Sequence, residues 1–145
     1  MGDWLQRNGS GYVDSTAYQA IRNIEREEQM AINRKQKGAR FERELAGRFR
    51  DYGYDESRRT AQYCGNTGDA SDVVGLPGIH IEAKHQEQMR LYDWMEQAKR
   101  DSKGSGNIPV VFHKKNRAEI LVTMRFDDFM NIYREYEAGR KGEDV

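Results

Sequence analysis

The sequence predicts an α/β fold in which helices flank a sheet of mixed strand direction. Apolar residues recur at helical spacing in several segments, and one segment alternates with a two-residue period. Clusters of Gly, Pro and Asn separate these segments. The expected order is helix, helix, strand, β-hairpin, helix, strand, strand, helix, which is typical of a sheet with helices packed on it.

Length and composition limit the possible classes of protein. A chain of 145 residues, 33% charged and 37% hydrophobic, supports one domain with a small core. No apolar run approaches the ~18 residues of a membrane span, and the start lacks the regions of a secretory signal. A lone Cys64 excludes an internal disulfide framework and a cysteine zinc cluster. We therefore expect an intracellular, cytoplasmic protein without membrane contact.

The first third of the chain carries no recognisable chemistry. Asp14 or Ser15 is expected to cap a helix whose far end is nearly all polar, and Gly38 to interrupt it. A second helix should then place Phe41, Leu45 and further apolar residues in one stripe up to Gly53, a left-handed cap. We predict a helical extension over residues 1–35, serving packing, oligomer or partner contact, and a single domain over 36–145.

The remaining elements follow from alternation and turn residues. The segment 61–71, rich in Gly and Asn, is expected to be a loop, and 76–78 the turn of a hairpin. The last helix should begin at Asp127 or Asp128. The expected strands are 54–60, 73–74, 79–84, 108–112 and 119–124, with a helix over 87–102.

The zero net charge is a sum of unlike blocks. Residues 34–59 and 84–117 are net basic, and they flank a segment, 60–83, that holds three acids and no base. This distribution suits basic arms that hold a polyanion around an acidic cluster that holds a cation. An uneven solvated surface is the alternative interpretation.

The hairpin carries the chemistry. A three-residue turn at 76–78 places Asp72 opposite Glu82, and Lys84 lies two residues further on the same face. Like charges at such a position are destabilising, and a divalent cation between the two carboxylates removes the repulsion. Oxygen ligands favour Mg²⁺ or Mn²⁺ over zinc. His80 shares this face, either as a ligand or packed at the hairpin rim.

These groups together suit phosphodiester hydrolysis. Mg²⁺ keeps several waters and lowers the pKa of a bound water. The Lys84 ammonium can orient that water or stabilise the charge of a phosphoryl transition state.

A third carboxylate is expected from the helix that follows Gly38. Glu44 has Arg40 and Arg48 four residues away on either side and is interpreted as a surface ion pair. Glu42 has no charged residue at these spacings and adjoins Phe41 on the apolar stripe. We therefore predict Glu42 as the third acid.

The residues resemble a known pattern at this point. Asp72 followed by Glu82-Ala83-Lys84 resembles the core of the PD-(D/E)XK nucleases. The run from Lys37 to Leu45 is similar to the first helix of archaeal-type Holliday junction resolvases. Arg59-Thr60-Ala61 also resembles the Arg-Ser-Ala stretch of those resolvases. The resemblance covers roughly residues 36–124.

The resemblance implies a restriction-endonuclease-like fold and a Mg²⁺-dependent endonuclease, with Mn²⁺ as substitute, that cuts branched DNA or four-way junctions as a homodimer in DNA recombination. The sequence departs from the resolvase pattern at three points. Ser71 rather than Pro precedes Asp72, the loop from Arg59 to Asp72 is longer, and this loop contains a second candidate acid, Asp69. The implied catalytic residues are Glu42, Asp72, Glu82 and Lys84; the implied metal site comprises Asp72, Glu82, Ala83 and Glu42; the implied DNA contacts are Arg43, Arg59, Arg58, Lys37 and Gln97.

Three other interpretations remain open. The same site would serve a restriction-like, repair or single-strand-specific nuclease. A degenerate nuclease fold would act as a non-catalytic DNA-binding module. A protein-interaction adaptor would be built around the charged amino-terminal helix.

Overall fold

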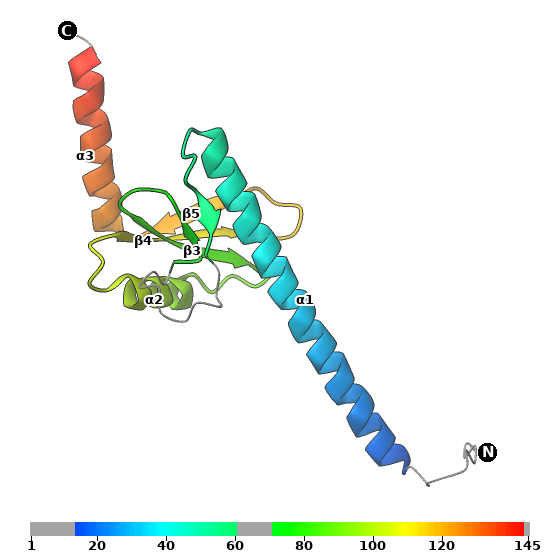
Figure 1. The fold of residues 1–145 in the computed structure, drawn as a ribbon. Helices are drawn as coiled ribbons and strands as arrows, with labels where there is room; N and C mark the ends of the chain where they lie inside the picture. The colour runs from blue at the N-terminus through cyan, green and yellow to red at the C-terminus, as the bar shows by residue number, and fades with distance from the viewer. Residues whose placement is uncertain (1–13, 61–70, 144–145) are drawn as a thin grey trace. The chain divides into compact units, whose positions relative to one another are not determined.

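The computed structural model describes residues 14–60 and 71–143, and this part of the chain contains three helices and a five-stranded sheet (Figure 1). By its contacts the chain divides into two units, residues 1–36 and 37–145. The elements are α1 (Ser15–Asp51), β1 (Arg58–Arg59), β2 (Val73–Val74), β3 (Ile79–His85), α2 (Leu91–Ser102), β4 (Ile108–Lys114), β5 (Leu121–Met124) and α3 (Phe126–Glu143). The expected loop over 61–71, with Asp69 and Cys64, lies outside the described residues except for Ser71.

Helix α1 is continuous through Gly38, so the expected break at this residue is wrong. A glycine inside a helix costs only about 1 kcal/mol relative to alanine, and the helix formers around Gly38 offset that cost. Both predicted ends are confirmed. Asp14 Oδ1 accepts a hydrogen bond from the Thr16 N–H at 3.2 Å, and Gly53 has a φ of 97° with its N–H bonded to the Arg50 carbonyl.

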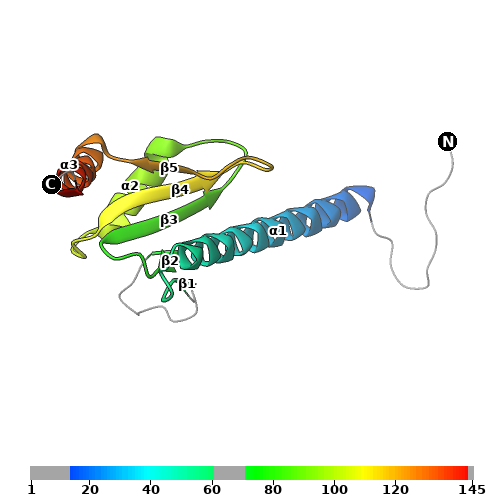
Figure 2. The same cartoon turned by 90° about the horizontal axis from the view of Figure 1, so that it is seen from above.

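The sheet is mixed, as predicted. Its strand order is β1-β2-β3-β4-β5, with β3 and β4 parallel and the other neighbours antiparallel (Figure 2). Helix α2 connects the two parallel strands, because parallel neighbours need a crossover rather than a tight turn. The architecture is that of a restriction-endonuclease-like α/β fold.

The core lies on both faces of β4, whose successive side chains point to opposite sides. Val110 and Phe112 pack with Phe41 and Leu45 of α1. Val111 belongs to a second buried cluster with residues of α2, namely Trp94, Met95 and Ala98. Helices α1 and α2 therefore cover opposite faces of the sheet, and β3 lies between them.

The hairpin of β2 and β3 has the predicted register. Val73 pairs with Ile81, and the Ile79 N–H bonds to the Leu76 carbonyl at 3.2 Å across the turn. Gly75 has a φ of 101°, and a Cβ built there would lie 2.5 Å from the Cα of Ser57. Only glycine fits where the hairpin passes this close to the chain before β1.

Helix α3 contributes nothing to the core, since it has no buried residue. It exposes an aromatic stripe, here called the α3 stripe, in which Phe129 and Tyr133 stack with ring centroids 6.2 Å apart. The stripe consists of Phe126, Phe129, Ile132, Tyr133 and Tyr136. Among the described residues, no helix is both long enough and apolar enough to cross a membrane.

Candidate active site

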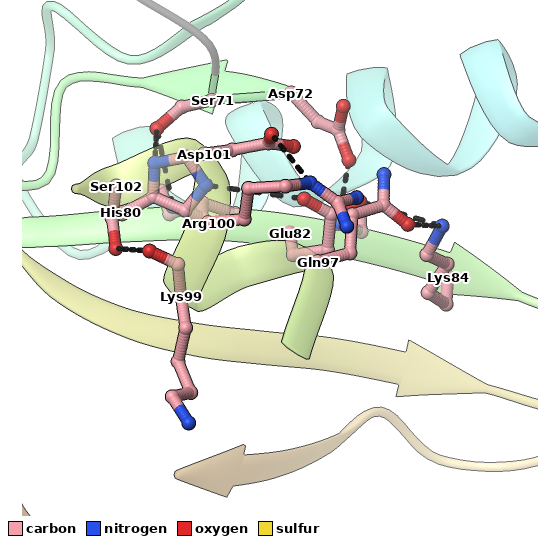
Figure 3. Close-up of polar contacts among 12 residues, drawn as sticks. Ser71, Asp72, His80, Glu82, Lys84, Gln97, Lys99, Arg100, Asp101 and Ser102 are labelled. Atoms are coloured by element: carbon pink, nitrogen blue, oxygen red, sulfur yellow. Dashed lines mark hydrogen bonds and ion pairs between the residues drawn. The ribbon is translucent and has the colours of Figure 1, made fainter. Parts of the chain in front are cut away.

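Asp72 and Glu82 lie opposite each other across the hairpin, as the register predicts. Asp72 directly precedes β2, and its Oδ2 accepts a hydrogen bond from the Ala83 N–H at 2.8 Å. Its own backbone carbonyl accepts hydrogen bonds from the N–H and the hydroxyl of Thr60. The carboxylate of Asp72 is therefore held against β3 (Figure 3), and its backbone is held by Thr60.

The environment of Asp72 opposes its negative charge. Burial raises the pKa of Asp72 to about 7, and repulsion from Glu82 and then Glu42 adds to the shift. The hydrogen bond from Ala83 and the charge of Lys84 lower the pKa without reversing the shift. Lys84 and the Ala83 hydrogen bond thus do not offset the burial and mutual repulsion of the two carboxylates. A bound cation would relieve this repulsion.

Glu82 is the most deeply buried acid of the site, with 1% of its surface exposed. Its Oε1 lies 3.3 Å from Lys84 Nζ. Its Oε2 is buried without a hydrogen-bond partner among the described residues. Lys84 in turn donates a hydrogen bond to Gln97 Oε1 at 3.0 Å, so α2 orients the ammonium (Figure 3).

Glu42 is buried, with 8% of its surface exposed, although it is an acid on a helix. Its carboxylate accepts a hydrogen bond from Arg59 Nε in an ion pair that joins α1 to β1. It acts on Asp72 electrostatically. Arg59, predicted as a phosphate contact, therefore pairs with Glu42. The role of Arg59 as a DNA contact and that of Glu42 as the third acid of the site both stay predictions.

The oxygen ligands of the site suit Mg²⁺ better than a metal whose ligands must all come from the protein. Asp72 and Glu82 offer oxygen ligands, and the buried Oε2 of Glu82 has an unused acceptor. Within 14–60 and 71–143, no three His, Cys, Asp or Glu side chains are gathered for a metal ion. Mg²⁺ is commonly held by one or two carboxylates and completes its shell with water, so this pair suffices.

The residues predicted to contact DNA surround the pair of Asp72 and Glu82 without belonging to it. Arg43 and Arg58 are exposed, and Lys37 lies 3.9 Å from the carboxylate of Glu87. Gln97 contacts Lys84 instead of standing free on the surface. Glu44 forms an ion pair with Lys114 of β4 at 3.6 Å, so it is a surface ion pair as predicted, with a different partner.

The sequence interpretation placed His80 on the face of Glu82, but its hairpin-rim alternative is wrong, and the contact of His80 with Ser71 was not predicted. His80 is not at a hairpin rim: it is 2% exposed, and its Nδ1 lies 2.9 Å from Ser71 Oγ. Parity along β3 placed His80 on the face of Glu82, but the depth of its burial depends on α2 packing over that face. A Ser directly before the Asp was the only local signal.

The mixed sheet, with an Asp before one hairpin strand and Glu-x-Lys on the next, defines a nuclease of the PD-(D/E)XK superfamily. Residues 33–141 match the family described as "Phage putative PDDEXK endonuclease", and the chain belongs to that family. No curated protein matches the chain, and no solved structure does. This family is described as an endonuclease and not as a Holliday junction resolvase, so the match does not confirm the resemblance to those resolvases.

Proposed function

We propose that this chain is a Mg²⁺-dependent endodeoxyribonuclease, active inside the cell on branched DNA in the manner of a Holliday junction resolvase. The observation that carries the hydrolytic part is the carboxylate pair of partly buried Asp72 and buried Glu82, with Lys84 beside it on one hairpin. Support for a branched substrate comes from the resemblance of Lys37 to Leu45 and of Arg59 to Ala61 to the resolvases.

Each residue of the site would have its own role in the hydrolysis. Asp72 and Glu82, with the backbone carbonyl of Ala83, would hold the ion. Glu42 of α1 would be the third acid of this metal site. When bound, Mg²⁺ supplies an activated water and Lewis-acid stabilisation of the phosphoryl oxygens; Mn²⁺ can replace it. The Lys84 ammonium, oriented by Gln97, stabilises charge that develops on the phosphate.

Basic side chains around the site would position the DNA backbone. Arg43 and Arg58 are exposed and available to phosphates, and Lys37 is partly exposed. Arg59 would contribute through its ion pair with Glu42.

A homodimer suits this function, because two symmetric cuts across a junction need two sites related by a two-fold axis. The α3 stripe supports it, since apolar patches of this kind mark contact surfaces. Helix α3 has Asp127 and Asp128 in its first turn and Arg140 and Lys141 in its last. An antiparallel pair of α3 helices would bring these opposite charges together.

Light scattering tests the dimer. Replacing Phe129 and Tyr133 by Ser should give monomers, whereas Tyr92→Ser, which alters an exposed aromatic on α2, should leave the mass unchanged. A dimer that survives the α3 substitutions contradicts the assignment of this surface.

Cleavage of a synthetic four-way junction, with and without Mg²⁺, tests the activity. Paired symmetric nicks in the junction, and none in linear duplex or flap, are the expected result. Asp72→Asn and Glu82→Gln should abolish cutting while leaving or strengthening binding, because repulsion of phosphates falls. Asp93→Asn, an exposed acid on α2, is the control.

The other outcomes identify the alternatives. Cutting of duplex or flap in preference to the junction indicates a restriction-like, repair or single-strand-specific nuclease. Junction binding without cutting indicates a non-catalytic module.

A further inference from the structure

His80 is a buried titratable group that the proposed chemistry does not use. Its ring lies between the residue that precedes Asp72 and the carboxylate of Glu82 (Figure 3). Nδ1 is 2.9 Å from Ser71 Oγ, and Nε2 is 3.9 Å from Glu82 Oε2. Among the described residues, neither Nε2 nor Oε2 has a hydrogen-bond partner.

The contact with Ser71 fits one tautomer of this ring. Ser71 Oγ accepts from the Ile81 N–H at 3.4 Å and lies 2.9 Å from His80 Nδ1, close enough for its hydroxyl to donate to an unprotonated Nδ1. A neutral imidazole that accepts at Nδ1 carries its hydrogen on Nε2. In that tautomer the donor of His80 faces Glu82 Oε2, which has no hydrogen-bond partner among the described residues.

We propose that His80 is a positioning residue that holds the Glu82 carboxylate through Nε2–H and Oε2, with Ser71 holding the ring in the required tautomer. The separation of 3.9 Å is too long for a direct hydrogen bond, so the proposed bond requires the carboxylate to rotate toward the ring. Oε1 lies 3.3 Å from Lys84 Nζ, so the ring and the ammonium would hold the two oxygens of one carboxylate.

The same contacts couple the two strands that carry the acids. Ser71 adjoins Asp72 in sequence, and His80 lies two residues before Glu82 on the same face of β3. The Ser71–His80 hydrogen bond thus links the strand of one carboxylate to the strand of the other. Groups that orient metal-binding carboxylates in this way commonly change metal affinity by about 10–100-fold when removed.

Manganese affinity tests the role of His80, which rests on the metal-dependent function proposed above. Calorimetric titration of the full chain with Mn²⁺ should give a Kd about 10-fold or more weaker for His80→Leu than for wild type. His80→Gln retains a donor near the position of Nε2 and should restore most of the affinity. His113→Leu removes another buried histidine, bonded to Thr123 of β5, and should leave the affinity unchanged.

Two results overturn the proposal. Wild-type affinity in a folded His80→Leu variant shows that the imidazole does not position Glu82. Equal loss in His80→Gln and His80→Leu shows that donation from Nε2 is not its role. Absence of Mn²⁺ binding by wild type, or equal binding by Asp72→Asn, instead counts against the proposed function.

The tautomer provides a test without metal. Long-range ¹H–¹⁵N spectra of the metal-free protein should show the hydrogen of the His80 ring on Nε2 and none on Nδ1. Ser71→Ala should remove this preference. A hydrogen on Nδ1 in wild type overturns the assignment whatever the metal titrations give.

Discussion

The carboxylate oxygen Oδ2 of Asp72 accepts a hydrogen bond of 2.8 Å from the backbone N–H of Ala83, the residue between Glu82 and Lys84. This bond fixes one acid of the site directly against the strand that carries the other acid and the lysine. It partly opposes the burial and repulsion that raise the pKa of Asp72 to about 7. The site is therefore held together although its charges repel.

The raised pKa predicts how the stability of the metal-free protein depends on pH. The native state binds a proton at Asp72 more tightly than the unfolded chain does, with a pKa of about 7 against 3.8. The contribution of Asp72 to the free energy of unfolding is therefore fully present below about pH 4 and is lost as the pH rises through 7. The total loss is on the order of 4 kcal/mol at most. Urea unfolding of wild type and Asp72→Asn across pH 4–8 measures it.

The difference between these two proteins isolates Asp72 from the other carboxylates. Asp72→Asn should become the more stable protein relative to wild type as the pH rises. Added Mg²⁺ should recover the stability of wild type at pH 8 and not that of the variant. A constant difference across this pH range would contradict the raised pKa.

The ion pair of Glu42 and Arg59 predicts that these residues act as a unit. Removing one charge leaves the other largely buried, so Glu42→Gln and Arg59→Gln should each destabilise the fold by about 1–3 kcal/mol. The double variant should lose less than the sum, because both partners are then absent. Urea unfolding at pH 7 provides the double-mutant cycle.

Glu44→Gln is the matched control for Glu42→Gln. Glu44 is exposed where it pairs with Lys114, so its loss should change stability by less than about 1 kcal/mol. Cleavage should also fall far more for Glu42→Gln. Equal effects of the two substitutions would remove Glu42 from the site.

Lys84 is predicted to act in the chemical step rather than in binding. Lys84→Met keeps the apolar stem and removes the ammonium, so kcat should fall on the order of 100-fold with little change in KM. Lys99→Met removes a lysine of α2 that pairs with Glu96 and should leave both constants unchanged. Single-turnover cleavage separates the two effects, and a rise in KM alone would make Lys84 a binding residue.

Gly75 and Gly78 predict different costs for the same substitution. Both have positive φ, but only at Gly75 does an added Cβ meet backbone, that of Ser57 at 2.5 Å. Gly78→Ala should cost about 1–2 kcal/mol for the left-handed conformation. Gly75→Ala should cost more than about 3 kcal/mol, because the hairpin must also move away from Ser57. Similar melting temperatures for the two variants would contradict this contact.

The hairpin was predictable because its signals are local. The alternation of residues 79–84 and the Leu-Pro-Gly turn define both the strand and its register, and register determines that Asp72 faces Glu82. Parity then places Lys84 and His80 on the same face. The helix stripe with Phe41 and Leu45 was equally visible, since the 3.6-residue period specifies which side is buried.

The sequence by itself thus determined the α/β class, the mixed sheet and the pairing of the two acids, since each depends on periodicity within a few residues. Tertiary structure alone decided that Arg59 pairs with Glu42, that Lys114 rather than Arg40 or Arg48 pairs with Glu44, and that Gln97 orients Lys84. It also decided that α1 continues through Gly38 and that His80 is buried against Ser71. These contacts join elements distant in sequence, and the packing of helices on the sheet sets which side chains meet.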